Sequence, residues 1–367
     1  MSLALARPRM VVPRADYPPR RSDGILVLQR GENASSDYYL RPRLAGAGAP
    51  AEIADFSQDP GGSPLLAPGG ARALTVVFCR YASPAWLQAL ESARARLSRV
   101  VLFMDDDLPA MMRAAEIPPA ARGKAALHFG AHAERLSALC SEVWVSTQAL
   151  AERYREAQPQ VLAPLPEAPP PEPSAEVPPL VVYHGTDVHD RERAFVLQVA
   201  RRLATLSPGA RLELAGEARL VGDAAGLPNV TVVPQRSWPD YLKAQTGRRA
   251  AISLAPLFAS PLNDARAPVK AFDAARLGAA GLFADAPAYR GAVRDGEDGL
   301  LLPMQPDAWA AAIAALLADP ERRLRLARMA RDRIVRLIAS DAGFPAAQAS
   351  GCIGSSRPSS PSRTAPR

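Results

Sequence analysis

The segment Ser260-Pro-Leu-Asn-Asp-Ala-Arg-Ala-Pro-Val-Lys-Ala-Phe-Asp-Ala-Ala-Arg-Leu-Gly278 follows an apolar, strand-like run at residues 250–254. Pro268 suits the first turn of a helix, where its missing N–H is not needed, and Gly278 suits a helix end. The sequence therefore predicts a strand, a loop and a helix that begins at Pro268. A helix start exposes unpaired backbone N–H groups and the positive end of the helix dipole, so this loop is suited to an anion.

Charged side chains flank the predicted helix start. Arg266 and Lys270 add positive charge, and Lys270 and Asp273 are three residues apart, so they share one face of the helix. The lysine lies nearer the helix start and the carboxylate lies one turn deeper. This arrangement suits a diphosphate that is followed by the hydroxyls of a ribose. The alternative interpretation is a solvated Lys–Asp pair on an ordinary amphipathic helix.

The sequence after this helix strengthens the first interpretation. A short apolar strand at residues 281–285 is followed by Ala286-Pro-Ala-Tyr-Arg290 and by a glycine-containing segment at residues 293–303. Most of residues 180–335 resembles the nucleotide-sugar-binding half of the group 1 GT-B glycosyltransferases. The positions that carry the resemblance are Asn263, Arg266, Lys270, Gly278, Pro287, Tyr289, Gly296 and Gly299. The chain departs from the family at Asp273, which is usually Glu, and at Ala265, where many members have another Glu.

The resemblance implies a fold, a reaction and a set of site residues. It implies an α/β protein with two Rossmann-like, doubly wound domains facing a cleft. It also implies a retaining transfer from a nucleotide sugar to a glycan or lipid-linked acceptor, commonly in cell-envelope polysaccharide synthesis, with no cofactor and no required metal. Lys270 and Arg266 would stabilise the departing diphosphate. The expected donor-binding residues are Gly185, Thr186, Asn263, Asp273 and Tyr289.

The order of apolar runs along the chain supports two domains. Short apolar runs alternate with helix-forming segments, which predicts parallel, doubly wound sheets with ligands at the carboxyl ends of the strands. A segment rich in Pro, Glu and Ala cannot form a core and is expected to be a stiff linker. The predicted divisions are a flexible N-terminus at 1–23, an acceptor-side domain at 24–163, the linker at 164–179, a nucleotide-sugar domain at 180–339 and a disordered tail at 340–367.

Three adjacent carboxylates mark the first domain. Asp105-Asp-Asp107 directly follows the apolar strand at residues 100–104, where ligands are expected. We expect Arg80, Asp105 and Asp106 to face the acceptor side of the cleft, with Arg80 and either Arg122 or Lys124 as charge partners. Two alternatives remain: a metal site built on Asp105-x-Asp107, as in GT-A enzymes, and a solvated turn.

Other polar residues are weaker candidates for the site. His128 and His132 are four residues apart in a predicted helix at 118–140, but a metal site would need a third ligand, so a packing role is favoured. His184 follows the first strand of the second domain, and Trp238 lies where relatives contact the nucleobase. Further candidates for the acceptor cleft, or for surface packing, are Tyr38, Tyr39, Arg41 and Arg43.

Composition limits the class of protein. The 367 residues carry a net charge of +7 and only 6% aromatic residues, without a basic patch interleaved with aromatics, so we expect no nucleic acid partner. The three cysteines show no pairing pattern, and no apolar run is long enough for a signal peptide or a membrane span. We therefore expect a cytoplasmic protein, with peripheral contact at the inner face of the membrane. Two other functions remain open: a non-catalytic GT-B-like scaffold and a sugar-nucleotide epimerase.

Overall fold

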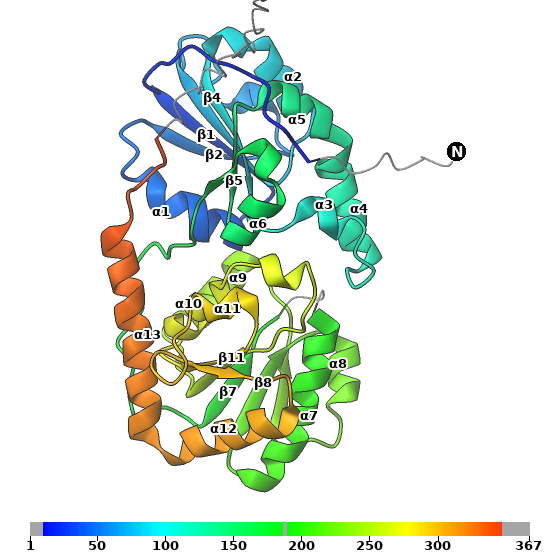
Figure 1. Ribbon diagram of the computed structural model, residues 1–367, viewed down its shortest axis with the longest axis vertical. Coiled ribbons are helices and arrows are strands. Elements are labelled where there is room, and N and C mark those ends of the chain that lie inside the picture. The colour runs from blue at the N-terminus through cyan, green and yellow to red at the C-terminus, as the bar shows by residue number, and fades with distance from the viewer. Residues whose placement is uncertain (1–9, 186–188, 347–367) are drawn as a thin grey trace, which may run out of the picture.

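The protein consists of two α/β domains, one above the other in Figure 1. This computed structural model describes residues 10–185 and 189–346. Each domain is built on a six-stranded sheet, and all strand pairs in both sheets are parallel. Helices cover both faces of such sheets, which explains why most strands read as continuous apolar runs. The predicted fold class, two Rossmann-like domains, is confirmed.

The sheet of the N-terminal domain has the order β2-β1-β3-β4-β5-β6. Its strands are β1 (Gly24–Gln29), β2 (Ala51–Asp55), β3 (Leu74–Cys79), β4 (Leu97–Met104), β5 (Glu142–Val145) and β6 (Gln160–Val161). Its helices are a π-helix (Ser36–Leu40), α1 (Arg41–Leu44), α2 (Pro84–Ser92), α3 (Leu108–Met111), α4 (Pro119–His128), α5 (Ala133–Leu139) and α6 (Gln148–Arg153). The single helix predicted at 118–140 is therefore two helices, joined by a short 3-10 turn at Gly130–His132. The fully buried Phe129 lies at this break.

The sheet of the C-terminal domain has the order β12-β11-β10-β7-β8-β9. Its strands are β7 (Leu180–Tyr183), β8 (Arg211–Ala215), β9 (Val230–Val233), β10 (Ile252–Ala255), β11 (Ala280–Ala284) and β12 (Leu300–Leu302). Its helices are α7 (Asp190–Leu206), α8 (Ala218–Asp223), α9 (Trp238–Gln245), α10 (Val269–Arg276), α11 (Pro287–Arg290), α12 (Pro306–Ala318) and α13 (Pro320–Ser340). Gly278 has a φ of +62°, which closes α10 as predicted.

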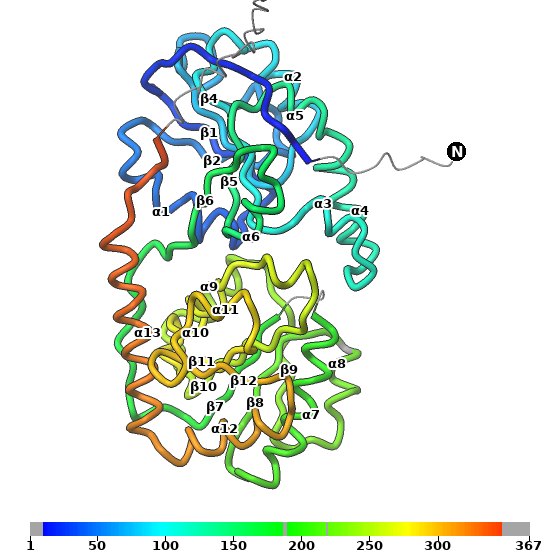
Figure 2. The backbone as a smooth tube through the Cα atoms, in the orientation of Figure 1, coloured from blue at the N-terminus to red at the C-terminus, as the bar shows by residue number. Residues whose placement is uncertain are grey.

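The last helix joins the two domains. In Figure 2, α13 runs along the side of the C-terminal domain, and the chain beyond it continues to the N-terminal domain. The Pro-rich linker packs along this helix, where Arg331 contacts Glu172 at 2.8 Å and Arg323 donates to the Ala175 carbonyl. Phe344 then packs edge-on against Trp144 of the N-terminal domain at 5.5 Å between ring centroids. The prediction of disorder from residue 340 onward therefore does not hold for residues 341–346.

The first described residues are also packed, although the sequence predicted a flexible N-terminus to residue 23. Val11 is fully buried, and the Tyr17 hydroxyl donates to the Leu139 carbonyl at 2.6 Å.

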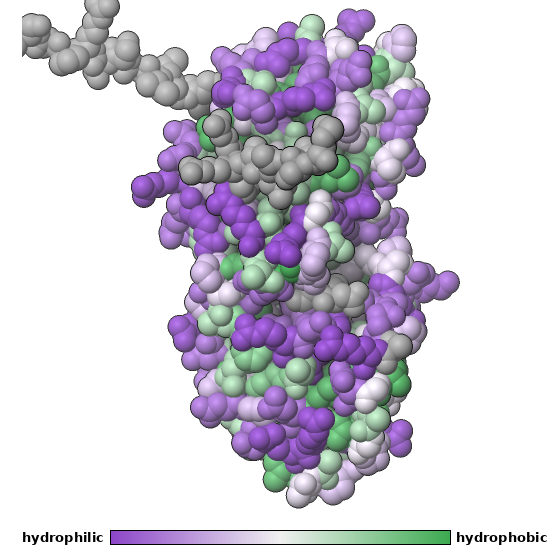
Figure 3. Space-filling view, turned by 90° about the vertical axis from the view of Figure 1, so that its right-hand side faces the viewer, coloured by the Kyte–Doolittle hydropathy of each residue, from purple (hydrophilic) through white to green (hydrophobic). Residues whose placement is uncertain are grey.

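The space-filling view shows a mostly hydrophilic surface that narrows between the two domains (Figure 3). In the described part of the chain, no helix combines the length and the apolar character needed to cross a membrane.

Candidate functional site

A cavity of about 670 Å³ lies between the domains, where the carboxyl ends of strands from both sheets meet. Residues of both domains line it, which agrees with the expectation that the two domains face a cleft. The predicted site residues that line it are Arg80, Asp105, Asp106, Gly185, Arg266, Lys270, Asp273 and Tyr289. Most of the residues proposed from the sequence are therefore brought together in one space.

The start of α10 forms one wall of this cavity. The helix begins at Val269, and its N-cap residue Pro268 offers no side chain to the first backbone N–H groups. Lys270 lies in the first turn, and its Nζ donates to the His184 carbonyl at 2.6 Å and to Asp273 Oδ2 at 3.1 Å. This wall therefore presents a positive helix end together with a lysine whose charge is partly balanced by one carboxylate.

Gly185 lies in the loop directly after β7 and also lines the cavity. A Cβ atom at this position would lie only 2.8 Å from the Tyr183 hydroxyl oxygen, so a larger residue would not fit without movement. The position therefore permits close approach to the backbone, as a diphosphate would require. The other residue expected in this loop, Thr186, lies outside the described residues.

Asp273 is buried and already has two partners. Its Oδ1 accepts a hydrogen bond from the Tyr38 hydroxyl at 2.6 Å, and its Oδ2 accepts one from Lys270. Burial raises the pKa of Asp273, but Lys270, the Tyr38 hydroxyl and Arg276 together hold this pKa below its usual value. The carboxylate is therefore ionised, and one of its oxygens contacts the opposite domain.

Aromatic side chains extend this contact between the domains. Tyr38 packs against Trp238 with 5.8 Å between ring centroids, and the Trp238 indole donates to Asp37 Oδ2 at 2.7 Å. Arg276 donates to the Tyr38 hydroxyl at 2.9 Å and its guanidinium lies 5.5 Å from the centre of that ring. Trp238 lines the cavity as well, but its polar atom contacts the N-terminal domain.

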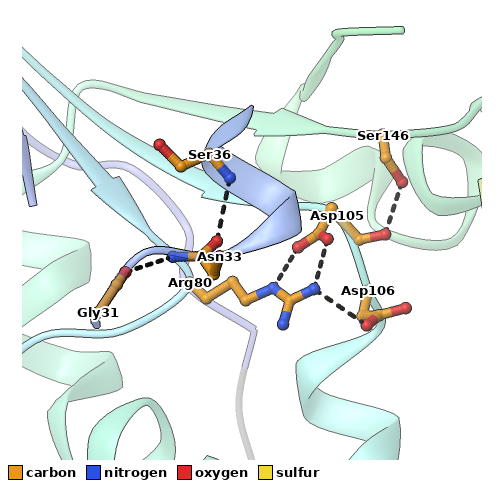
Figure 4. A network of polar contacts seen from close by, with 7 residues as sticks. All are labelled: Gly31, Asn33, Ser36, Arg80, Asp105, Asp106 and Ser146. Atoms are coloured by element: carbon orange, nitrogen blue, oxygen red, sulfur yellow. Dashed lines mark hydrogen bonds and ion pairs between the residues drawn. The ribbon is translucent and has the colours of Figure 1, made fainter. Parts of the chain in front are cut away.

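The opposite wall carries a charged cluster from the N-terminal domain (Figure 4). Arg80 forms a bidentate pair with Asp105, and its Nη2 also lies 3.2 Å from Asp106 Oδ2. Arg80 has a φ of +70°, a strained backbone conformation that is found preferentially at functional sites. Of the partners predicted for the acidic segment, Arg80 is correct. Lys124 instead lies over the Tyr81 ring, 5.3 Å from its centre.

Asp107 does not share this cluster. Its Oδ1 accepts from the Ala110 backbone at 2.9 Å and caps α3, and its carboxylate also contacts Arg153 and Tyr154. It does not line the cavity, so Asp105 and Asp107 do not face one ligand as a metal pair would. Among the described residues, no group of three metal-ligating side chains comes together. His128 packs against the Phe56 ring at 5.2 Å, in agreement with a packing role.

Some predicted residues lie outside the cavity. The Asn263 amide donates to the Phe258 carbonyl at 2.8 Å and holds the loop before α10 in shape. Tyr39 lines the cavity, but Arg41 pairs with Asp37, and Arg43 pairs with Asp341 at 2.5 Å. Arg41 and Arg43 therefore form ion pairs outside the cavity and do not line it.

Two features of the cavity were missed by sequence reasoning. One is His189, which lines the cavity. Its Nε2 lies 3.2 Å from Nη1 of Arg266. Glu213, buried in the middle of β8, accepts from His184 at 2.9 Å and from both terminal nitrogens of Arg248 at 3.0 Å. Burial raises the pKa of Glu213, but His184 and Arg248 lower it to about 2. A carboxylate between the two leucines of β8 was the available signal for this network.

Comparisons with known proteins agree with the fold. Residues 178–319, essentially the C-terminal domain, match the family model described as glycosyl transferases group 1. No curated protein sequence matches the chain significantly.

Among solved structures, Anabaena HepE in complex with UDP and glucose is similar with a TM-score of 0.54 and 14% identity, over 85% of this chain and 95% of that chain. HepE in complex with UDP-glucose gives 0.53 and 16%, over 86% and 98%. TarM of S. aureus gives 0.51 and 11%, over 72% of this chain and 52% of that chain. The two facing domains therefore have the GT-B fold.

Proposed function

We propose that the protein is a glycosyltransferase that moves a sugar from a uridine diphosphate sugar to a glycan or lipid-linked acceptor. The carrying observation is the convergence of the α10 start, Arg266, Lys270 and Gly185 on one wall of the cavity. The group 1 match covers this wall, and the similar HepE structure contains UDP-glucose. These features support a donor site in the C-terminal domain.

The chemistry follows from where charge develops. As the bond between the anomeric carbon and the diphosphate breaks, negative charge grows on the diphosphate and the sugar becomes oxocarbenium-like. Donors held in place before the reaction stabilise that charge most effectively. Arg266, Lys270 and the backbone N–H groups of α10 would supply this stabilisation without a metal ion or cofactor. The acceptor would bind on the wall of Arg80, Asp105 and Asp106, and the family resemblance favours retention of anomeric configuration.

We also propose a setting in cell-envelope polysaccharide synthesis, in the cytoplasm and at the inner face of the membrane. The assignment is supported by the group 1 resemblance. Its test is an assay of transfer to candidate acceptors, with the anomeric configuration of the product read by NMR. An inverted product would overturn the retaining mechanism but not the transfer.

One observation favours a second function. Both oxygens of Asp273 are already bound, one of them by the opposite domain, so a ribose would have to share or displace a partner. This arrangement would suit a scaffold that does not turn over a donor. An epimerase would release an altered nucleotide sugar instead.

A thermal-shift panel of UDP, GDP and ADP with their sugars separates these functions when it is combined with product analysis. A ligand at about 100 times its dissociation constant adds roughly 2.7 kcal/mol of stability. We expect stabilisation by uridine nucleotides and release of UDP in the presence of acceptor. Stabilisation without release would favour the scaffold, and an epimerised donor would favour the epimerase. Failure of every nucleotide to stabilise the protein would argue against all three.

A further inference from the structure

His189 lies between two spaces in the protein. It directly precedes α7 and lines the main cavity, and it also lines a smaller crevice of about 80 Å³ between the domains. Arg266 is the other residue that lines both spaces. The side chain of His189 is only 17% exposed. The pair is therefore enclosed beside the start of α10. It belongs to the wall formed by Gly185, Arg266, Lys270 and the α10 start, which we call the donor wall.

The contact between these residues fixes the tautomer of the histidine. Arg266 Nη1 lies 3.2 Å from His189 Nε2, and a guanidinium can only donate hydrogen bonds. Nε2 is therefore unprotonated and accepts, so the ring proton is on Nδ1. Glu192 Oε2 lies 3.7 Å from Nδ1, and the buried Glu192 side chain favours a proton at that position. Glu192 thus holds the ring in the tautomer that Arg266 needs.

This arrangement leaves Arg266 without a carboxylate in direct contact, and Asp106 of the opposite domain acts on it only at longer range. Among the described residues, the guanidinium of Arg266 contacts His189 and forms no ion pair with a carboxylate, and its Nε is buried without a hydrogen-bond partner. Arg80 on the opposite wall is different, because Asp105 and Asp106 both pair with it. A neutral imidazole can orient an arginine without competing with an incoming anion, whereas a carboxylate would compete.

We propose that His189 is a positioning residue whose unprotonated Nε2 directs Arg266 toward the diphosphate of the donor. This inference rests on the proposed donor site. Protonation of His189 would convert Nε2 from acceptor to donor and would set a cation against Arg266. Donor binding should therefore weaken as the pH falls through the titration of this histidine.

The charged groups around His189 come from four elements. Glu192 lies on α7, Arg266 lies in the loop before α10, Lys270 lies on α10, and Asp106 follows β4 in the opposite domain. Burial lowers the pKa of His189, Arg266 and Lys270 lower it further, and Glu192 opposes them. A lowered pKa keeps the ring neutral at pH 7, so its full positioning role is present there and is lost only in acid.

Three substitutions separate orientation from charge, with the dissociation constant for UDP-glucose measured by calorimetry at pH 7.5. His189→Gln keeps a neutral acceptor, so we expect binding within about threefold of wild type. His189→Leu removes the acceptor, and we expect binding about tenfold weaker, which corresponds to the loss of one hydrogen bond. His189→Glu supplies an acceptor that also cancels the charge, so we expect it to bind at least as weakly as the leucine variant. A purely structural role would instead make glutamate the best replacement, because it pairs with Arg266 most strongly.

The pH dependence gives a second measurement. Between pH 5.5 and 7.5 the diphosphate of UDP-glucose keeps its charge, so the protein is the source of any change. Because the pKa of His189 is lowered, we expect wild-type binding to weaken only at a pH below the ordinary histidine pKa of about 6.5, and binding by the glutamine variant to stay level. Nitrogen NMR of the free protein should show the proton of His189 on Nδ1.

The outcomes distinguish this inference from the proposed function. If the wild type binds UDP-glucose and all three variants bind it with the same affinity, only the role of His189 is overturned. The same holds if binding by the glutamine variant also weakens in acid. A proton found on Nε2 in the free protein at pH 7.5 would overturn it as well. Failure of the wild type to bind UDP-glucose would overturn the proposed donor and this inference together.

Discussion

Lys270 and Arg266 carry the same charge but are balanced differently. Lys270 contacts Asp273 at 3.1 Å and a backbone carbonyl, whereas Arg266 contacts a neutral histidine. Lysine is a compact point charge on a flexible stem, so it can move from its resting partners to an incoming phosphate. Arginine has a rigid fork and depends more on being held in a fixed direction. The two residues would therefore serve one anion in different ways.

Replacement of Lys270 by alanine tests the proposed stabilisation of the leaving group. We expect Lys270→Ala to lower turnover on the order of 10²-fold, as loss of one preorganised donor does. The fold should remain intact, because the lysine is partly exposed and Asp273 keeps its bond from Tyr38. Steady-state kinetics with circular dichroism would measure both effects.

Lys243→Ala is a matched control, because Lys243 is exposed on α9 and does not line the cavity. It should leave turnover unchanged. Equal turnover in a folded Lys270→Ala variant would remove Lys270 from the catalytic set.

The sequence predicted which residues surround the donor wall better than it predicted what they touch. Lys270, Arg266 and Gly185 are close in sequence to the β10 and β7 ends, so local pattern was enough to place them. The partner of Asp273 is Tyr38, more than 200 positions away in the other domain. Neither spacing nor helical periodicity contains information on such a contact, because it depends on how the two domains meet.

At the scale of elements, the π-helix Ser36–Leu40 meets α10 across the cleft. Tyr38 at its centre is fully buried and fits between Trp238 and Phe272, while its hydroxyl connects Asp273 to Arg276. A hydrogen bond to a charged group contributes about 1.5–3 kcal/mol. Since the bond joins two domains, that free energy stabilises the closed arrangement of the cleft.

Removal of this hydroxyl is expected to open the cleft. Tyr38→Phe should shift the equilibrium between closed and open domains by tenfold or more, on the basis of about 1.5 kcal/mol for the lost bond. Small-angle X-ray scattering of the ligand-free protein should then show a larger radius of gyration than wild type.

The chain offers a close control for this measurement. Tyr17 also donates a hydrogen bond of 2.6 Å, but its partner, the Leu139 carbonyl, belongs to the same domain. Tyr17→Phe should lower thermal stability without changing the scattering. An unchanged radius of gyration in Tyr38→Phe would show that other contacts alone keep the cleft closed.

Element boundaries show the limits of local pattern in the same way. The apolar runs at 100–104, 250–254 and 281–285 correspond to β4, β10 and β11, and the observed ends differ from the predicted ones by at most three residues. The short strands β2 and β6 were missed, since two to five residues at a sheet edge carry little periodicity. The return of α13 to the first domain was also missed. Its amphipathic pattern predicts a helix but does not identify the surface that the helix covers.

At the scale of the whole molecule, the two domains bring opposite charge patterns to one cavity. The C-terminal wall presents a helix start and two cations, and the N-terminal wall presents Asp105 and Asp106 held by Arg80. The sequence predicted both walls and their separation between domains. The folded molecule adds an interaction across the cleft: burial raises the pKa of Asp106, Arg80 lowers it, and Arg266 and His189 of the opposite domain lower it further.

The cations on the C-terminal wall and the carboxylates on the N-terminal wall bear on how the charge of the donor's diphosphate would be neutralised. A metal-bridged donor would need acidic ligands grouped around the diphosphate, but Asp107 turns away to cap α3, and Asp105 is bound by Arg80. In the proposed donor site, Arg266, Lys270 and the α10 start would supply the counter-charge for the diphosphate instead. We therefore expect sugar transfer to survive EDTA with little change in rate. We also expect Asp106→Asn to affect the acceptor KM more than donor binding.

Asp107→Asn is a control for the Asp106 variant, because it alters a carboxylate outside the cavity. It should lower the stability of the protein and leave the binding of donor and acceptor unchanged. Transfer would be assayed after dialysis against EDTA and again after addition of magnesium or manganese. If chelation abolished transfer and a divalent ion restored it, the donor would depend on a metal bound by residues other than those assigned here. If Asp106→Asn weakened UDP-glucose binding as much as Lys270→Ala, the acidic wall would belong to the donor site, and the division of the cavity between the two domains would be wrong.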